Sequence, residues 1–84
     1  MSKTAKILHK ILSGQSDASI LFPELGYLLE KLGFSVRIRG SHHIFYREGV
    51  EEIINLQSRG KNAKPYQVRQ VRALILKYKL GGAL

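Results

Sequence analysis

Residues 34–47 read Phe-Ser-Val-Arg-Ile-Arg-Gly-Ser-His-His-Ile-Phe-Tyr-Arg, and this stretch decides the fold. Its first six residues alternate between apolar side chains and serine or arginine, which is the period of a half-buried β-strand. Gly40 and Ser41 then supply a turn, and aromatic and β-branched residues follow. We therefore expect two antiparallel strands, over residues 34–39 and 43–47, joined by a tight turn.

The flanking sequence predicts one more strand and three helices. Glu48 and Gly49 turn the chain into a third strand near residues 52–56. Apolar residues recur at helical spacing over residues 3–13 and 23–32, and again from Pro65 to the glycine pair at residues 81–82. The expected order is helix, helix, three strands, helix, an α+β fold with the helices on one face of an antiparallel sheet.

The length of 84 residues favours one domain, residues 1–84, with a modest core. The first helix, residues 3–13, is expected to dock loosely because it has only one narrow apolar stripe. The polar and basic stretch 57–64 has no periodicity and is expected to be a flexible loop.

Fourteen Lys and Arg against six Asp and Glu give a formal net charge of +8, which is large for so small a chain. Such a field attracts polyanions, so nucleic acid is the first expected partner, and an acidic protein would fit the same charge. The chain has no cysteine, no apolar signal core and no apolar run long enough for a membrane span. We expect a cytoplasmic protein with no membrane association and no cofactor.

His42 is the residue best suited to chemistry, because imidazole both takes up and releases a proton near neutral pH. Cleavage of an RNA phosphodiester needs such a group and no metal, since the adjacent 2′-hydroxyl is already a tethered nucleophile. Arg37, Arg39 or Lys64 would hold the phosphate, and the turn at Ser41 would let the RNA backbone approach. A histidine beside a strand turn is also commonly an ordinary surface residue.

His43 would point to the opposite face from His42, so the two cannot act on one phosphate. With no cysteine and with Glu51 and Glu52 well removed in sequence, a metal site is not expected. Ser41 lacks an evident acid partner as a nucleophile. The candidate RNA-binding residues are Arg37, Arg39, Ser41, Arg59, Lys61 and Lys64.

Residues 32–34, Leu-Gly-Phe, and residues 39–45, Arg-Gly-Ser-His-His-Ile-Phe, resemble the HicA family of bacterial toxins. The resemblance spans about residues 22–80 and implies a fold like that of double-stranded-RNA-binding domains, with a toxin core over about residues 20–80. It also implies a metal-independent mRNA interferase, toxin of a type II toxin–antitoxin system, with a HicB antitoxin as partner. The histidine after Gly-Ser is catalytic in that family and corresponds to His42 here.

The chain departs from the family after the third strand. Many relatives have a Pro-x-His segment there, whereas residues 55–59 read Asn-Leu-Gln-Ser-Arg. Arg59 and Lys61 are the candidates to replace what that segment contributes. Two other functions fit the same residues: a non-catalytic RNA-binding module that uses the basic sheet face, and a basic subunit that only scaffolds an acidic partner.

Overall fold

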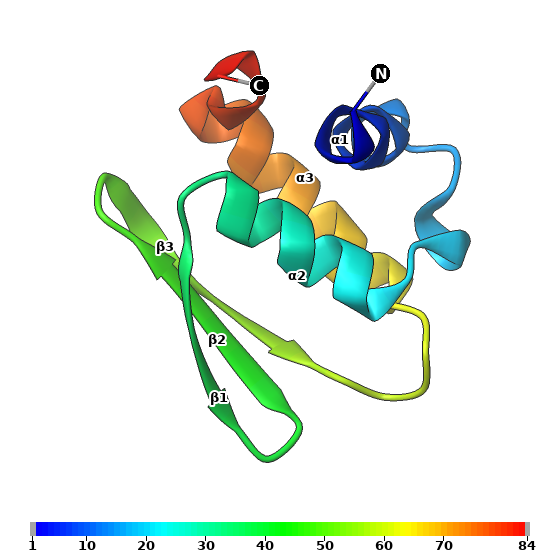
Figure 1. Ribbon diagram of the computed structural model, residues 1–84, viewed down its shortest axis with the longest axis vertical. Helices are drawn as coiled ribbons and strands as arrows, with labels where there is room; N and C mark the ends of the chain where they lie inside the picture. Colours follow the sequence, from blue (N-terminus) through cyan, green and yellow to red (C-terminus); the bar gives the residue numbers. More distant parts are fainter. Residues whose placement is uncertain (1, 84) are drawn as a thin grey trace.

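The structure, a computed structural model, describes residues 2–83. Its elements, in chain order, are α1 (Lys3–Ser13), η1 (Asp17–Ser19), α2 (Phe22–Lys31), β1 (Ser35–Arg39), β2 (His42–Arg47), β3 (Val50–Gln57), α3 (Pro65–Tyr78) and η2 (Leu80–Ala83). The strands form one antiparallel sheet in the order β1-β2-β3. Figure 1 shows the helices on one side of this sheet, which confirms the predicted α+β architecture and element order.

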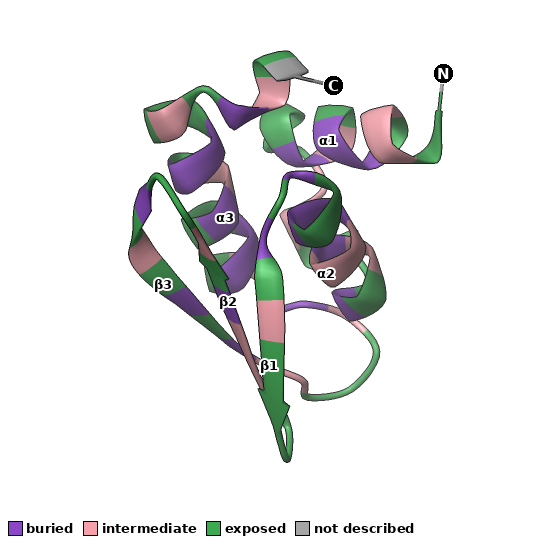
Figure 2. Cartoon of the chain, turned by 60° about the vertical axis from the view of Figure 1, so that its left-hand side comes forward, coloured by how far each residue is buried: buried purple, intermediate pink, exposed green. Residues whose placement is uncertain are grey.

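The core lies between the sheet and the helices. Phe45 and Ile54 reach it from the sheet, and Leu25 and Val68 reach it from α2 and α3. Figure 2 shows buried residues on the facing sides of these elements and exposed residues on the outer sides. Alternation along the strands produces this arrangement, because every second side chain turns toward the helices.

Helix α1 is more firmly packed than its sequence predicts. Ile7, Leu8 and Ile11 are all buried in the same core cluster, and α1 contacts both α2 and α3. The expectation of loose docking was wrong, because the narrow stripe packs against two helices at once. Leu12, the next apolar residue of this helix, is 38% exposed.

Helix α2 begins beside Pro23, and the Glu24 carboxylate accepts a hydrogen bond from the Leu21 N–H at 2.9 Å. Helix α3 begins at Pro65 as predicted but ends at Tyr78, before the glycine pair. Lys79 adopts the left-handed conformation there, with φ of 55°, although that conformation favours glycine. The predicted helix end was therefore too late.

The segment between β3 and α3 is held at several points, so the expectation of a flexible loop was wrong. The Lys61 carbonyl accepts from the Phe22 N–H at 2.9 Å, and the Ala63 N–H donates to the Ile20 carbonyl at 2.8 Å. Leu21 and Asn62 form an isolated antiparallel bridge between these two bonds. Pairing of this kind is invisible to periodicity, because each side contributes too few residues to form a strand.

The polar residues 15–19 contain the short turn η1, which a long-range ion pair fixes against α3. Arg72 donates to both carboxylate oxygens of Asp17, at 2.9 and 3.0 Å, and also to the Ile11 carbonyl at 3.0 Å. The guanidinium group lowers the pKa of Asp17, chiefly through these hydrogen bonds. Within residues 2–83, no helix combines the length and apolar character that a bilayer crossing requires.

Candidate functional site

The two histidines of the hairpin lie on opposite faces of the sheet, as strand alternation predicts. His43 faces the helices and packs edge-on against Phe22, with ring centroids 5.0 Å apart. His42 is exposed and pairs with Arg39 on β1 and Gln57 on β3. Only His42 is therefore presented on the side of the sheet that no helix covers.

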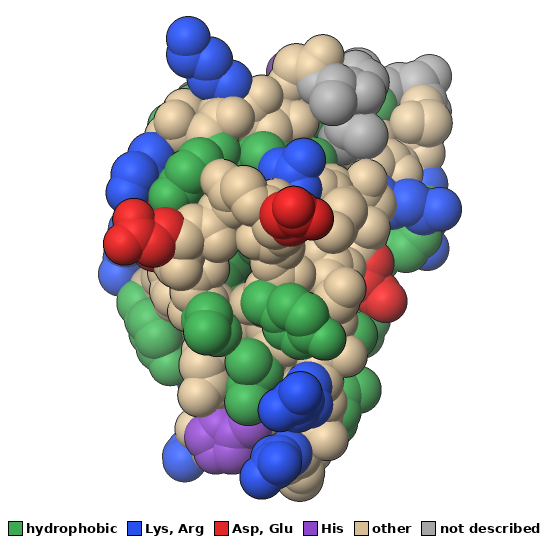
Figure 3. Space-filling view, turned by 90° about the vertical axis from the view of Figure 1, so that its left-hand side faces the viewer, with side chains coloured by type: hydrophobic (Ala, Val, Ile, Leu, Met, Phe, Trp, Pro, Cys, Tyr) green, Lys and Arg blue, Asp and Glu red, His purple; other side chains and the backbone are tan. Residues whose placement is uncertain are grey.

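We call this side the open sheet face. Its cross-strand pairs form rows across the three strands. The first row is Arg39, His42 and Gln57, and the second is Arg37, Ile44 and Asn55. Ser35, Tyr46 and Ile53 follow on the same face farther from the β1–β2 turn. Figure 3 views the molecule from this side: in the lower part, Lys or Arg side chains flank a His, and hydrophobic side chains lie directly above them.

Asn55 lies against the His42 ring. The Nδ1 atom of His42 is 3.3 Å from Oδ1 of Asn55, on the neighbouring strand. A side-chain amide oxygen only accepts hydrogen bonds, so this contact corresponds to the tautomer in which Nδ1 carries the proton. In the neutral ring, Nε2 then keeps its lone pair and can accept a proton from a substrate.

The turn beside His42 is tied to the end of β3. The Ser41 carbonyl accepts from the Ser58 N–H at 2.9 Å, and the Ser41 hydroxyl accepts from the Gln57 side-chain amide at 3.4 Å. Gly40 has φ of 58°, and a Cβ there would meet no atom within 4 Å. The turn is thus fixed on one side and open on the other, where a ligand backbone has room to approach.

The predicted basic residues separate into two groups. Arg37 and Arg39 lie on the open sheet face beside His42. Arg59 directly follows Ser58 and so lies close to the turn, whereas Lys61 and Lys64 lie farther along, where the chain turns toward α2 and α3. A separate hollow of about 330 Å³ lies in this segment. It is lined by Ala18, Arg59, Gly60, Lys61, Asn62, Ala63, Lys64 and Pro65.

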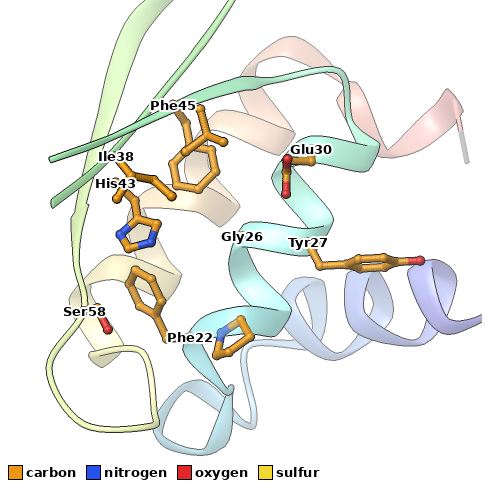
Figure 4. A pocket seen from close by; sticks show the side chains of 10 residues that line it. Phe22, Gly26, Tyr27, Glu30, Ile38, His43, Phe45 and Ser58 are labelled. Atoms are coloured by element: carbon orange, nitrogen blue, oxygen red, sulfur yellow. The ribbon is translucent and has the colours of Figure 1, made fainter. Parts of the chain in front are cut away.

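A second hollow, of about 410 Å³, lies on the helix side of the sheet and is lined by Phe22, His43 and Ile38, among other residues. Figure 4 shows the His43 and Phe22 rings near each other and Ile38 on the adjacent strand. Ile38 is 59% exposed, although its alternation predicts burial. β1 is an edge strand, and α2 leaves this end of it uncovered. The His42 side chain is not among the residues that line this groove.

Among residues 2–83, no three His, Cys, Asp or Glu side chains come together as a set of metal ligands. The open sheet face instead offers one imidazole, two guanidinium groups and two amides. These groups can move a proton and hold an anion. Asn55 and Gln57 were not among the predicted site residues. Alternation along the predicted strand 52–56 indicates the face of Asn55, whereas Gln57 was expected in the following loop and lies at the end of β3 in the structure.

Comparison with known protein families identifies one matching family. The family model described as HicA toxin of bacterial toxin–antitoxin matches residues 22–78 of the chain. The matched part includes α2, the whole sheet and α3, and leaves out α1. Searches of curated proteins and of solved structures returned no significant match. Because the family match covers well over half of the chain and its fold agrees, the chain belongs to the HicA toxin family of bacterial toxin–antitoxin systems.

Proposed function

We propose that the chain is a metal-independent endoribonuclease that cleaves mRNA, with His42 as its general acid–base residue. The observation that carries the proposal is the position of His42 on the open sheet face. It stands between Arg39 and Gln57, exposed, with Nδ1 held by Asn55. An exposed imidazole with a fixed orientation and a guanidinium group on the adjacent strand suits a reaction at a phosphodiester.

In this reaction Nε2 of His42 removes the proton of a ribose 2′-hydroxyl. The 2′-oxygen then bonds to the adjacent phosphorus, and the bond from phosphorus to the 5′-oxygen of the next nucleotide breaks. The leaving 5′-oxygen takes up one proton, from the imidazolium ion or from water. The products are a 2′,3′-cyclic phosphate and a 5′-hydroxyl, with no oxidant, reductant or metal in the balance.

Arg39 and Arg37 would stabilise the charge that develops on the phosphorus-bound oxygens. Paired residues of antiparallel strands have Cα atoms about 5 Å apart, so a phosphate beside His42 is within reach of the long Arg39 side chain. Arg37 is one row away on the same strand and face. Arg59, Lys61 and Lys64 would extend the contact to neighbouring phosphates, and Ser41 would contribute through the turn backbone.

Membership of a toxin–antitoxin family implies an antitoxin partner. We propose a HicB-type antitoxin that inhibits the enzyme by covering the open sheet face. The formal charge of +8 favours an acidic surface on that partner. Such a partner and an RNA substrate would compete for the same arginines, so binding of one should exclude the other.

The test is cleavage of a single-stranded RNA by the purified chain in the presence of EDTA. His42→Ala should reduce the rate by about 10²- to 10⁴-fold, which is the usual contribution of a general acid–base group. Because His42 is exposed, the variant should keep the wild-type circular dichroism spectrum and melting temperature. His9→Ala, which removes an exposed histidine on α1, is the matched control and should cleave normally.

Four outcomes would reject the proposal. A fully active His42→Ala enzyme would exclude the imidazole from the chemistry, and loss of cleavage in EDTA would show that a metal is required. RNA binding that weakens steeply with salt and leaves the RNA intact would identify the chain as a non-catalytic RNA-binding module on the same face. A chain with no RNA affinity at all would be a scaffold for an acidic partner.

A further inference from the structure

The open sheet face continues beyond His42 into a surface of different chemistry. Tyr46 lies on the central strand, four residues from His42 and on the same face. Tyr46 is 43% exposed, and Ile53 on the neighbouring strand is 65% exposed. Ile44 lies between Tyr46 and His42 along β2. An exposed aromatic ring with aliphatic neighbours in the middle of a sheet is a surface suited to a flat, apolar ligand face.

The two ends of the open sheet face differ in charge. Arg37 and Arg39 lie near the β1–β2 turn. Glu51 lies with Ile53 in the irregular stretch of β3 opposite Tyr46, where the β2–β3 register shifts between Phe45 and Arg47. In Figure 3 the acidic side chains appear higher than the lower group of basic side chains and His, and Lys or Arg side chains also lie beside the acidic ones. An anion is therefore favoured at the His42 end, and a neutral group at the Tyr46 end.

We propose that Tyr46, flanked by Ile44 and Ile53, is a stacking site for a nucleobase of single-stranded RNA. A nucleotide has both required parts, a phosphate for the arginine end and a planar base for the tyrosine end. A base in a duplex has its faces covered by its neighbours, so only an unpaired base can stack on a protein ring. This inference rests on the proposed ribonuclease function and names the form of its substrate.

The distance between Tyr46 and His42 limits which nucleotide the tyrosine ring can bind. Four residues of β-strand span about 13 Å, at about 3.3 Å per residue. Tyr46 is therefore too far from His42 to contact the base adjoining the cleaved bond. It would hold the base of a nearby nucleotide and so fix the register of the RNA on the sheet. A preference for purines or pyrimidines at that nucleotide would originate at this ring.

Binding is measured by fluorescence anisotropy in the His42→Ala background, which prevents cleavage. The probes are a 12-nucleotide single-stranded RNA, the duplex of the same sequence, and single strands with one abasic position each. Tyr46→Phe keeps the ring and should bind as before. Tyr46→Val keeps strand propensity and removes the ring, and should weaken single-strand binding by roughly 5- to 100-fold, the usual effect of losing one base stack.

Three further results are expected if the site is real. Duplex binding should be equal with and without the ring. One abasic position should weaken binding to the protein with Tyr46 and leave the Tyr46→Val protein unaffected. Tyr66→Ala, which removes a tyrosine that is 58% exposed on α3, on the helix side of the sheet, should have no effect.

Equal single-strand affinity of Tyr46→Val and Tyr46→Phe, with both folded by circular dichroism, would overturn the stacking site. Loss of antitoxin binding alone, with RNA binding intact, would overturn it as well and would reassign this surface to the protein partner. These outcomes are distinct from failure of the proposed function, which is decided by RNA cleavage with Tyr46 and His42 both intact.

Discussion

Gln67 is a buried polar residue on which the junction between the sheet and α3 depends. It is 1% exposed, and its side-chain amide makes two hydrogen bonds. Nε2 donates to the Gln57 carbonyl at 3.1 Å, at the end of β3, and Oε1 accepts from the Lys64 N–H at 3.0 Å, at the start of α3. Substitution Gln67→Met keeps the length of the side chain and removes both bonds.

The cost follows from these two bonds. Removing one partner of a buried hydrogen bond costs about 1–3 kcal/mol, and the added apolar surface of methionine offsets part of the total. We expect Gln67→Met to lower the free energy of unfolding by about 2–3 kcal/mol. For a domain of this size that corresponds to a fall in melting temperature of roughly 10–20 °C.

The assay is urea unfolding followed by circular dichroism, with thermal melting as a second measure. Gln70→Met is the matched control, because Gln70 lies on the same helix and is exposed. It should change the free energy of unfolding by less than about 0.5 kcal/mol. If Gln67→Met and Gln70→Met unfold at the same urea concentration, the two hydrogen bonds do not hold this junction.

Two further substitutions test other contacts of the fold, and an analysis of the cleaved RNA ends tests the chemistry. The hydrogen bonds from Lys77 and from the Tyr78 hydroxyl lower the pKa of Glu52 from 4.5 to about 2. This carboxylate therefore stabilises the fold above about pH 4.5 and loses that effect as the pH falls toward 2. Glu52→Gln should therefore be less stable than the wild type at pH 7, with a difference that shrinks over that window in acid titrations; a difference that does not vary with pH would contradict the assignment. Gly33→Ala should lower the free energy of unfolding, measured in urea, by about 1–3 kcal/mol, because φ there is +96° and a Cβ would lie 3.1 Å from Arg47 Nε. Gly82→Ala is the control: its Cβ would meet nothing within 4 Å, so the free energy of unfolding should hardly change. If cleavage uses only the 2′-hydroxyl and an imidazole, the cut ends should carry 2′,3′-cyclic phosphates, and 3′-hydroxyl ends detected by mass spectrometry would refute that route.

The face on which each hairpin residue lies was predictable from the sequence. A strand has a period of two, so burial of the apolar residues of 34–39 fixes the face of every residue in the strand. His42 and His43 are adjacent and must therefore lie on opposite faces. The family resemblance and the alternation then point to the same histidine. Burial was less predictable than the face: Ile38 lies on the helix side as expected but is 59% exposed, because β1 is an edge strand and a hollow separates this end of it from α2.

Contacts between distant polar residues were not predictable. Asp17 and Arg72 are 55 positions apart, and each alone is typical of a solvated surface. Gln67 occupies a position on the apolar side of α3, where periodicity identifies it as an interruption and gives no reason for its burial. Gln67 is buried because its side chain bonds two backbone groups, the Lys64 N–H and the Gln57 carbonyl. These two groups come close to each other only once β3 and α3 have packed together.

The arrangement of the layers has a practical consequence for experiments on surfaces. In Figure 1, α1 begins and η2 ends on the side of the molecule away from the β1–β2 turn. An affinity handle or fluorophore attached before α1 or after η2 would therefore be joined far from the β1–β2 turn. Protein immobilised in this way would present His42 and its neighbours outward, so binding of RNA and of the antitoxin can be compared on the same chip without interference from the attachment.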